Sequence, residues 1–235
     1  MISWLKSRDN PLKAIHLALG CADYADSYRL QHRLHALRCA GEIPDTILTV
    51  EHNPVFTIGR SGSRANILVP AEILTAEGIA VYDIERGGDI TYHGPGQLVV
   101  YPIIDLREQG RDLKRYIRNL EQALIDCLQE FGIVGDRRPG FPGVWVKKRK
   151  IASVGVYVKH WVTLHGLALN VCVNKKHFGL INPCGMEIDV VSLDDLLEEA
   201  VGLEEVALRL LSKMEPLFGW AFTKGEVGEF LENST

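Results

Sequence analysis

The stretch RGGDITYHGPGQ, residues 86–97, places four glycines beside an arginine, a threonine and a histidine. Segments with the apolar composition of strands lie on both sides of it, at residues 79–84 and 98–104. A glycine-rich turn between two strands can bring backbone N–H groups close to a ligand, because glycine has no Cβ to keep the ligand away. The stretch contains neither GKS or GKT nor the GxGxxG spacing, so it does not indicate a phosphate-binding loop.

The side chains of residues 86–97 instead favour recognition of a carbonyl or carboxyl group. Arg86 is available as a cation, Thr91 and His93 as hydrogen-bond donors, and Gln97 as an amide that both donates and accepts. The alternative is a structural loop in which His93 only satisfies backbone groups, which is the commoner role of a lone histidine in a turn. The clustering of polar residues shifts the balance toward a binding site.

Periodicity around this stretch predicts one domain, residues 1–235, in which helices and strands alternate. Short links between the late strands argue against an all-parallel sheet. The fold class that we expect is therefore α/β of the α+β type, with a mixed β-sheet flanked by helices. The expected helices are residues 23–41, 70–78, 112–131 and 203–218, with a capping pattern headed by Ser192, and the expected strands are residues 46–51, 55–58, 79–84, 98–104, 143–160 and 162–173.

The composition is that of a soluble globular protein, with 46% hydrophobic and 24% charged residues in a chain of 235. No apolar run is long enough to span a bilayer, and the first residues lack the pattern of a signal peptide, so we expect a cytoplasmic protein with no membrane partner. The five cysteines are scattered without CxxC spacing and indicate neither a zinc site nor a disulfide framework. No metal site is expected.

Charge is strongly segregated along the chain. Residues 137–186 contain nine Lys or Arg and no Asp or Glu, whereas residues 187–235 contain twelve acids and three bases. The basic segment is either a solvated surface balanced by the acidic C-terminal helices or a docking surface for an acidic partner. Its aromatic residues show no stacking arrangement, so no nucleic-acid partner is expected. A catalytic base in this segment must be His or Lys.

Lys150 is one candidate for that base. It closes the run KKRK, and such a run at a hairpin tip is usually solvated. If the following IASVGVYV is a strand, however, Lys150 shares a face with Ala152, Val154, Val156 and Val158. An apolar face beside other cations lowers the pKa of a lysine and makes its neutral amine available as a base, although the side chain could also extend to water.

Cys184 is a candidate nucleophile. It lies in NPCG, residues 182–185, where turn-forming residues on both sides of the thiol would present its sulfur outward. Surroundings without carboxylates favour the thiolate, and Gly185 would let backbone N–H groups approach a developing oxyanion. A thiol and a base are the components of covalent acyl transfer, but the pattern alone does not pair Cys184 with Lys150.

Four ordered motifs, RGGDITYHGPGQLVVYP, KIASVG, HGLALNV and NPCGM, resemble those of the octanoyltransferases, also called lipoyl(octanoyl) transferases or lipoate-protein ligase B. The resemblance implies the fold of the biotinyl and lipoyl ligases. It implies transfer of an octanoyl group from octanoyl-acyl carrier protein to a specific lysine of lipoyl domains, those of 2-oxoacid dehydrogenase E2 subunits and of the glycine cleavage H protein. Exchange between thioesters is nearly isoenergetic, so neither ATP nor another cofactor is expected.

The resemblance also implies roles for individual residues. Cys184 would form the acyl-thioester intermediate, and Lys150 would lower the pKa of the thiol and take part in proton transfer. Two alternatives are an ATP-dependent lipoate-protein ligase of the same fold and a non-catalytic module that binds acyl carrier or lipoyl domains. The implied substrate-binding residues are Arg86, Gly87, Gly88, Asp89, Ile90, Thr91, Tyr92, His93, Ser153, Val154, Gly155, Gly166, Leu167 and Ala168.

Overall fold

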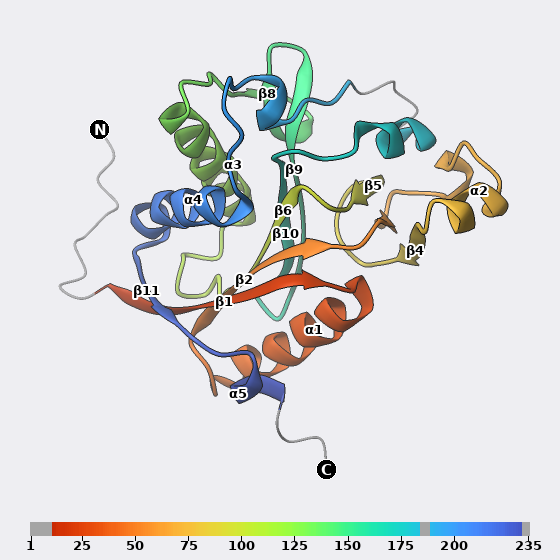
Figure 1. Ribbon diagram of the computed structural model, residues 1–235. Helices are drawn as coiled ribbons and strands as arrows, with labels where there is room; N and C mark the ends of the chain where they lie inside the picture. The colour runs from red at the N-terminus through yellow and green to blue at the C-terminus, as the bar shows by residue number, and fades with distance from the viewer. Residues whose placement is uncertain (1–10, 184–188, 232–235) are drawn as a thin grey trace.

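The computed structural model describes residues 11–183 and 189–231, and it contains two β-sheets with helices packed against them (Figure 1). The helices are α1 Tyr24–Ala40, α2 Ala71–Ala76, α3 Leu113–Glu130, α4 Leu203–Phe218 and α5 Gly228–Leu231, with short 3-10 helices η1 Arg64–Asn66, η2 Lys175–Leu180 and η4 Leu193–Asp195. The strands are β1 Leu12–Ala22, β2 Asp45–His52, β3 Val55–Ile58, β4 Ala80–Asp83, β5 Ile90–His93, β6 Gln97–Ile103, β7 Asp136–Arg138, β8 Phe141–Val146, β9 Arg149–Lys159, β10 Val162–Asn170 and β11 Trp220–Lys224.

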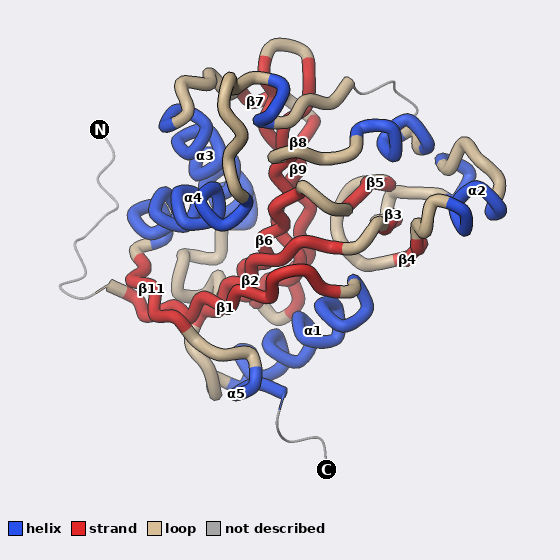
Figure 2. Tube along the Cα trace, in the orientation of Figure 1, coloured by secondary structure: helices blue, strands red, loops and turns tan. Residues whose placement is uncertain are grey.

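The larger sheet has eight strands in the order β11-β1-β2-β6-β10-β9-β8-β7. Strand β1 pairs in parallel with β2 and β11, while the remaining neighbours are antiparallel. Helices α3 and α4 pack on one face of this sheet, and α1 packs on the other (Figure 2). A mixed sheet flanked by helices is the expected fold class, and the structure confirms it.

The smaller sheet has three strands in the order β4-β3-β5. Its own core contains Phe56, Ile58, Tyr92 and Ile181, and both α2 and η2 contribute to it. This sheet includes β5, which was not expected, because its four residues lie inside the glycine-rich stretch that the sequence predicts to be a turn. Antiparallel pairing with β3 gives the stretch its extended shape.

The structure departs from the sequence prediction at other places as well, and β7 and α5 are among the elements that were not expected. Strands β1 and β11 were not expected, and both lie at the edge of the large sheet, where they pair with each other in parallel. The single segment 143–160 is a hairpin of β8 and β9 rather than one strand. Helices α1 and α3 confirm the expected spans to within a few residues, and Asp112 caps α3 by accepting from the Arg115 N–H at 2.9 Å.

A close approach of β6 to β10 depends on Gly166. A Cβ added to Gly166 would lie 2.1 Å from the Val100 carbonyl oxygen and 2.6 Å from Cδ of Pro102. Both neighbours belong to the fully buried strand β6, so neither can move away cheaply. The two central strands of the large sheet therefore pair at their present spacing only because position 166 has no side chain.

We expect Gly166→Ala to lower the free energy of unfolding by about 1–3 kcal/mol, because the added methyl group overpacks a site enclosed by backbone. Urea unfolding followed by circular dichroism measures the change. Gly179→Ala is the matched control, because a Cβ at Gly179 meets nothing within 4 Å. Equal stability of the two variants would contradict the packing argument.

Candidate functional site

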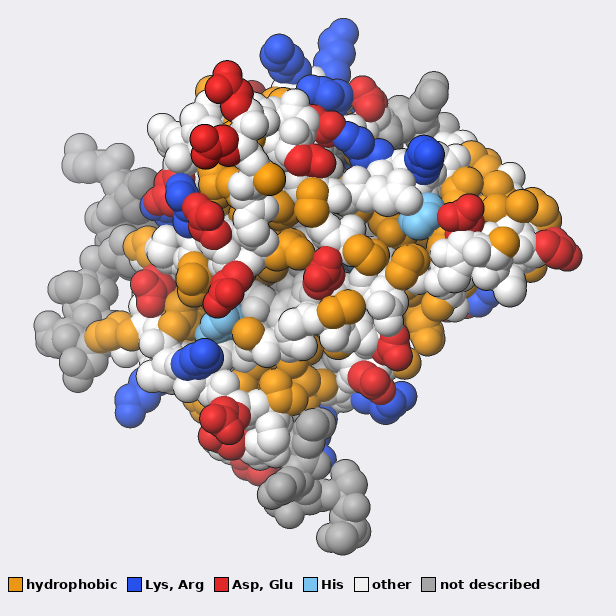
Figure 3. Space-filling model, in the orientation of Figure 1, with side chains coloured by type: hydrophobic (Ala, Val, Ile, Leu, Met, Phe, Trp, Pro, Cys, Tyr) orange, Lys and Arg blue, Asp and Glu red, His pale blue; other side chains and the backbone are white. Residues whose placement is uncertain are grey.

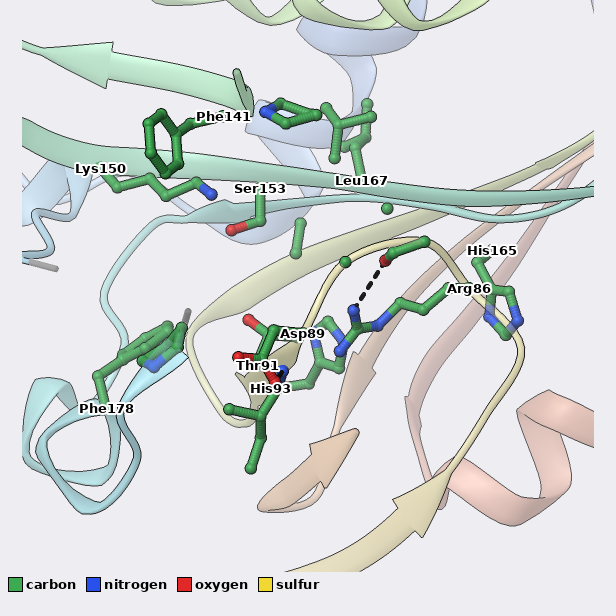
Figure 4. Close-up of a pocket in the computed structure, with 18 of the residues that line it drawn as sticks. Arg86, Asp89, Thr91, His93, Phe141, Lys150, Ser153, His165, Leu167 and Phe178 are labelled. Atoms are coloured by element: carbon green, nitrogen blue, oxygen red, sulfur yellow. Dashed lines mark hydrogen bonds between the residues drawn. The ribbon is translucent and has the colours of Figure 1, made fainter. Parts of the chain in front are cut away.

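A cavity of about 930 Å³ lies between the two sheets. Its walls come from the loop before β5, from β5 and β6, from β9 and β10, from η2, and from the first turns of α3 with β8. Figure 4 shows these walls, with Arg86 and His165 toward one end of the cavity and Lys150 and Phe141 toward the other. Residues far apart in the sequence therefore meet around one space.

The predicted site residues converge on this cavity. Lys150 lines it, and so do all the predicted substrate-binding residues except Tyr92, namely Arg86, Gly87, Gly88, Asp89, Ile90, Thr91, His93, Ser153, Val154, Gly155, Gly166, Leu167 and Ala168. The Tyr92 side chain lies in the core of the small sheet, where its hydroxyl is 2.9 Å from Nδ1 of His177. Alternation along β5 places Tyr92 on the strand face opposite to that of Thr91 and His93. Binding of a substrate by these residues stays a prediction.

Arg86 is a buried guanidinium that binds the protein itself. Its Nε and Nη2 donate to Oγ1 of Thr57 at 3.2 and 2.9 Å, and Nη2 also donates to the Thr57 carbonyl at 2.5 Å. Nη1 donates to the Gly87 carbonyl at 3.0 Å. Burial lowers the pKa of Arg86 to about 10, so the group remains charged at neutral pH. Its donors hold the glycine-rich loop, and a role of Arg86 as a cation for the ligand stays a prediction.

Asp89 is occupied in a similar way. Its carboxylate accepts from Nδ2 of Asn66 at 2.7 and 2.9 Å and from the Ile90 N–H at 2.6 Å. The Gly87 N–H donates to the Val156 carbonyl of β9 at 2.9 Å. These bonds tie the loop to η1 on one side and to the large sheet on the other, and they set the width of the cavity between them.

His93 is buried and neutral. Burial lowers its pKa to about 3. Nε2 of Gln97 donates to Oδ1 of Asn170 at 2.9 Å, so Oε1 of Gln97 is the acceptor that faces Nδ1 of His93 at 2.7 Å. The proton of the neutral ring is therefore on Nδ1, and Nε2 is an acceptor. Gln97 does not line the cavity itself but holds two residues that do, His93 and Asn170.

Lys150 reaches the cavity from the start of β9, beside Ser153 (Figure 4). Its Nζ lies 5.4 Å from the centroid of the Trp145 ring, which faces it across the β8–β9 pair. A Cβ at Gly143 would come within 3.0 Å of Cε of Lys150, so glycine at that position leaves room for the lysine side chain. The predicted face shared by Lys150 and the valines is wrong. Val154 and Val156 pack into the core beneath α3, whereas Lys150 lies over the Trp145 ring on the other face of the sheet, because the register of β8 and β9 shifts between the Val144 and Trp145 pairings.

Cys184 lies outside the described residues. Pro183, which precedes it in the chain, and Asp189 both line the cavity. The Asp189 carbonyl accepts from the Lys150 N–H at 2.8 Å. The assignment of Cys184 as nucleophile therefore stays a prediction.

Several wall residues were missed by the sequence analysis. Val99 and Tyr101 are alternate residues of β6. They form part of the buried side of the cavity, which is called its floor below. Alternation within LVVYP could have indicated them, but only with knowledge of which face of β6 meets the ligand. Tyr24, His165 and Asn170 also line the cavity; His165 and Asn170 lie in the motif HGLALNV, but the sequence analysis gave a site role only to residues 166–168 of it.

His165 is held in a polar network beneath the floor. Its N–H donates to Oε1 of Gln31 at 3.0 Å, and its Nε2 lies 3.6 Å from Oε1 of Glu85. Burial opposes ionisation of Glu85, but the neighbouring His165 ring and the Tyr28 hydroxyl, which donates at 2.7 Å, lower the pKa of this carboxyl group to about 2. The Glu85 carboxylate thus holds His165 in place from outside the cavity.

Charge around the cavity follows the segregation seen in the sequence. Some cations of the basic segment are paired, since Arg137 donates to Glu121 at 3.0 Å and Lys175 binds Asp195. Lys147 and Lys148 are exposed at the turn of the β8–β9 hairpin, where Figure 3 shows Lys and Arg side chains gathered.

Among the described residues, no cluster of His, Cys, Asp and Glu is arranged to hold a metal ion. No described helix is long and apolar enough to cross a membrane.

Comparison with known proteins gives a family. The model of the lipoyl protein ligase A/B catalytic domain matches residues 23–215. An octanoyltransferase of Syntrophobacter fumaroxidans is 47% identical over 207 residues, which cover 88% of this chain and 91% of that protein.

Solved structures give the same fold at lower identity. A crystal structure of lipoate-protein ligase A bound with ATP has a TM-score of 0.76 at 15% identity and covers 93% of this chain and 91% of its own. Biotin protein ligase from Aquifex aeolicus in complex with biotin and ATP has a TM-score of 0.52 at 15% identity and covers 88% of this chain and 70% of its own. The expected likeness to the biotinyl and lipoyl ligase fold is confirmed.

The neutral histidines predict a loss of stability in acid. The pKa values of His93 and His52 are lowered by burial to about 3 and about 4, so below pH 6.5 the unfolded chain binds protons that the folded chain excludes. Each such group lowers the free energy of unfolding by up to about 1.4 kcal/mol per pH unit as the pH falls from 6.5 toward its folded-state pKa.

We expect His93→Asn to reduce this slope, because Nδ2 of Asn can replace Nδ1 as donor to Gln97 without titrating. Urea unfolding between pH 7 and pH 4 measures it. His160→Asn, at an exposed turn, is the control and should keep the slope of the unsubstituted protein. If the slope were unchanged in His93→Asn, His93 would not be one of the groups that folding keeps from binding a proton.

Proposed function

This chain belongs to the octanoyltransferase family, within the lipoyl protein ligase A/B catalytic domains, and from that premise we propose that it transfers an octanoyl group to lysines of lipoyl domains. The proposed donor is octanoyl-acyl carrier protein. The proposed acceptors are the lipoyl domains of 2-oxoacid dehydrogenase E2 subunits and the glycine cleavage H protein. The reaction would begin protein lipoylation in the cytoplasm.

The observation that carries this proposal is the convergence of separate motifs on one cavity. Residues 86–91 and 93, 153–155 and 166–168 line it together with Lys150. The floor is apolar or neutral, because Val99, Leu167 and Ala168 have no charge and burial keeps His93 deprotonated. An octanoyl chain gains free energy from leaving water for such a floor, at roughly 0.8 kcal/mol for each buried methylene group.

In the proposed first half-reaction, the thiolate of Cys184 attacks the carbonyl carbon of the donor thioester. The bond to the carrier sulfur breaks, and the carrier leaves as a thiol after taking one proton. Lys150 is the proposed source of that proton, which it received earlier from the Cys184 thiol. Gly185 would let backbone N–H groups approach the oxyanion.

In the second half-reaction, the amine of the acceptor lysine attacks the acyl-enzyme. The attacking amine is neutral; as the amide bond forms and the Cys184 sulfur leaves, the nitrogen loses one proton, which passes through the neutral amine of Lys150 to the Cys184 thiolate. Exchange between thioesters is nearly isoenergetic and amide formation is downhill, so the sequence of steps consumes no ATP.

An ATP-dependent lipoate ligase is the alternative within the same fold. The likeness to lipoate-protein ligase A bound with ATP is at 15% identity and concerns the fold. The relatives at 43–47% identity are octanoyltransferases. Incubation with free octanoate, ATP and an acceptor domain separates the two reactions, because only the ligase would modify the acceptor without a thioester donor.

We expect the protein to gain the mass of one octanoyl group when it is incubated with octanoyl-acyl carrier protein in the absence of acceptor. Hydroxylamine should remove the group, because thioesters are labile to it. Cys184→Ala should gain no mass, whereas Cys172→Ala, which removes an exposed thiol elsewhere in the chain, should be acylated normally. Acylation of Cys184→Ala would overturn the proposed intermediate.

Lys150→Gln should slow formation of this acyl-enzyme by about 10²–10⁴-fold, because the thiol loses both its neighbouring cation and its proton acceptor. Rates measured by quenched-flow mass spectrometry from pH 6 to pH 10 should also shift toward higher pH. Lys224→Gln removes a lysine from the exposed end of β11 and serves as the charge-matched control. Normal acylation of Lys150→Gln would remove Lys150 from the proposed mechanism.

A further inference from the structure

Trp145 is a buried tryptophan that lies outside the hydrophobic cores. Its exposure is 3%, yet the valines on either side of it in β8 turn to the opposite face of the sheet and pack in the core beneath α3. The described contacts of the indole ring are with Phe141, Arg138 and Lys150. Two of these three neighbours are cations. Burial in an apolar core therefore does not account for the position of this ring.

The strand order places the ring between the two cations. β8 lies between β9 and β7, and Trp145 pairs with Lys150 of β9 on one side while Arg138 comes from β7 on the other. Nζ of Lys150 lies 5.4 Å from the ring centroid, and Cζ of Arg138 lies 5.0 Å from it. Both distances are within the roughly 6 Å over which the electron-rich face of an indole attracts a cation.

Gly143 leads the Lys150 side chain to this ring. Residues 143 and 145 alternate on β8 and face the same side. A Cβ at Gly143 would lie 3.0 Å from Cε of Lys150, so the lysine stem lies against the glycine backbone. The register shift before the pair of Trp145 and Lys150 turns the lysine away from the core face of β9. The stem and the ammonium group thus follow a defined path along β8.

Trp145 acts on the cavity only through the lysine. Lys150, Phe141 and Ser153 line the cavity, and Figure 4 shows the Lys150 side chain beside Phe141 and extending toward Ser153. Trp145 does not line the cavity. The indole therefore supports the side of the lysine that faces away from a ligand.

Charged side chains also surround Lys150 on the neighbouring elements. Arg137 pairs with Glu121, and Lys175 pairs with Asp195. Other charged side chains nearby are Arg138, Lys147, Lys148, Arg149 and Asp189, of which Arg149 is half-buried and the rest are exposed. Water and salt screen interactions between exposed charges, whereas the indole that contacts Nζ is buried. A change confined to the ring face tests one buried contact of Lys150 while these charges stay in place.

Resting on the proposed function, we propose that Trp145 is a positioning residue for Lys150, because its ring face holds the lysine at the cavity wall in the charged form. Arg138 and Phe141 fix the ring from its other sides. The ring attracts an ammonium group and not a neutral amine. The ammonium form of Lys150 stabilises the proposed thiolate of Cys184, and its proton then goes to the carrier sulfur as the thioester bond breaks.

The direction of the effect is opposite to that expected from the sequence. An apolar face would lower the pKa of Lys150, because it disfavours the charged amine. The indole face raises this pKa, because it favours the charged amine. Weakening the attraction of the ring without changing its shape should therefore lower the pKa of Lys150.

NMR measures the ionisation of Lys150 directly. The protein is labelled with ¹³C at Cε of lysine and titrated, and the Lys150 resonance is assigned by its absence in Lys150→Gln. Trifluorotryptophan at position 145 keeps the ring shape but withdraws electrons from its face, so it should lower the pKa of Lys150 by about 0.4–1.5 units. The same replacement of Trp161, an exposed ring beside Arg111, is the matched control and should leave the titration unchanged.

Formation of the acyl-enzyme from octanoyl-acyl carrier protein gives a second measurement. Trp145→Leu should slow it about three- to thirtyfold at alkaline pH and less at pH 7, because Lys150 then loses its proton at lower pH. Trp145→Phe keeps an aromatic face and should restore most of the rate. This change breaks no described hydrogen bond, since Nε1 of Trp145 has no acceptor among the described residues. Trp161→Leu is the control and should keep the profile of the unsubstituted protein.

Two results would overturn the role of Trp145. One is a Lys150 titration that trifluorotryptophan at position 145 leaves unchanged or moves to higher pH. The other is a rate that Trp145→Leu lowers by the same factor at every pH, because a loss of structure alone has that effect. The NMR titration needs no donor, so a protein that takes no octanoyl group from the carrier would overturn the proposed function and leave the test of Trp145 intact.

Discussion

The buried guanidinium of Arg86 is the interaction on which the cavity depends. It joins Thr57 of the small sheet to the loop before β5, and the next residue, Gly87, bonds Val156 of the large sheet. Removing a charge from water is costly, and the acceptors on Thr57 and Gly87 offset that cost. Gly59 makes the arrangement possible, because a Cβ there would lie 2.8 Å from Nη1 of Arg86 and 2.4 Å from the Gly88 carbonyl. The two sheets are thus held at a fixed separation, and the space between them is the cavity.

This arrangement explains how far the sequence could predict the site. The motifs contain the residues that form the walls, so Arg86, Lys150 and Gly166 could be selected without a structure. Their individual tasks could not be predicted in the same way. Whether the donors of an arginine face a ligand or the backbone depends on which strand lies beneath it, and β3 approaches Arg86 through pairing with β5. Because pairing also sets the alternation of side chains, Tyr92 faces the core although it lies within the motif.

The elements that the sequence analysis did not predict were missed for one physical reason. Strands β1 and β11 are separated by nearly the whole chain, and their parallel pairing at the sheet edge has no local signal. Helices α1 and α3 were predictable because their caps and apolar spacings are local properties. The contact between α3 and β8 has the same cause. Glu121 accepts from the Gly143 N–H, a bond that neither segment indicates alone.

The distribution of charge relates these features to the proposed reaction. Burial holds His93 neutral, and the cation of Arg86 is enclosed by acceptors of the protein, so this part of the cavity presents little charge to a ligand. Lys147 and Lys148 are exposed outside, and Lys150 lies between the two regions. An apolar chain is stabilised in the first region and an acidic protein near the second. A thioester that connects such a chain to such a protein must then place its reactive carbonyl at the boundary, beside the lysine that the proposed reaction requires.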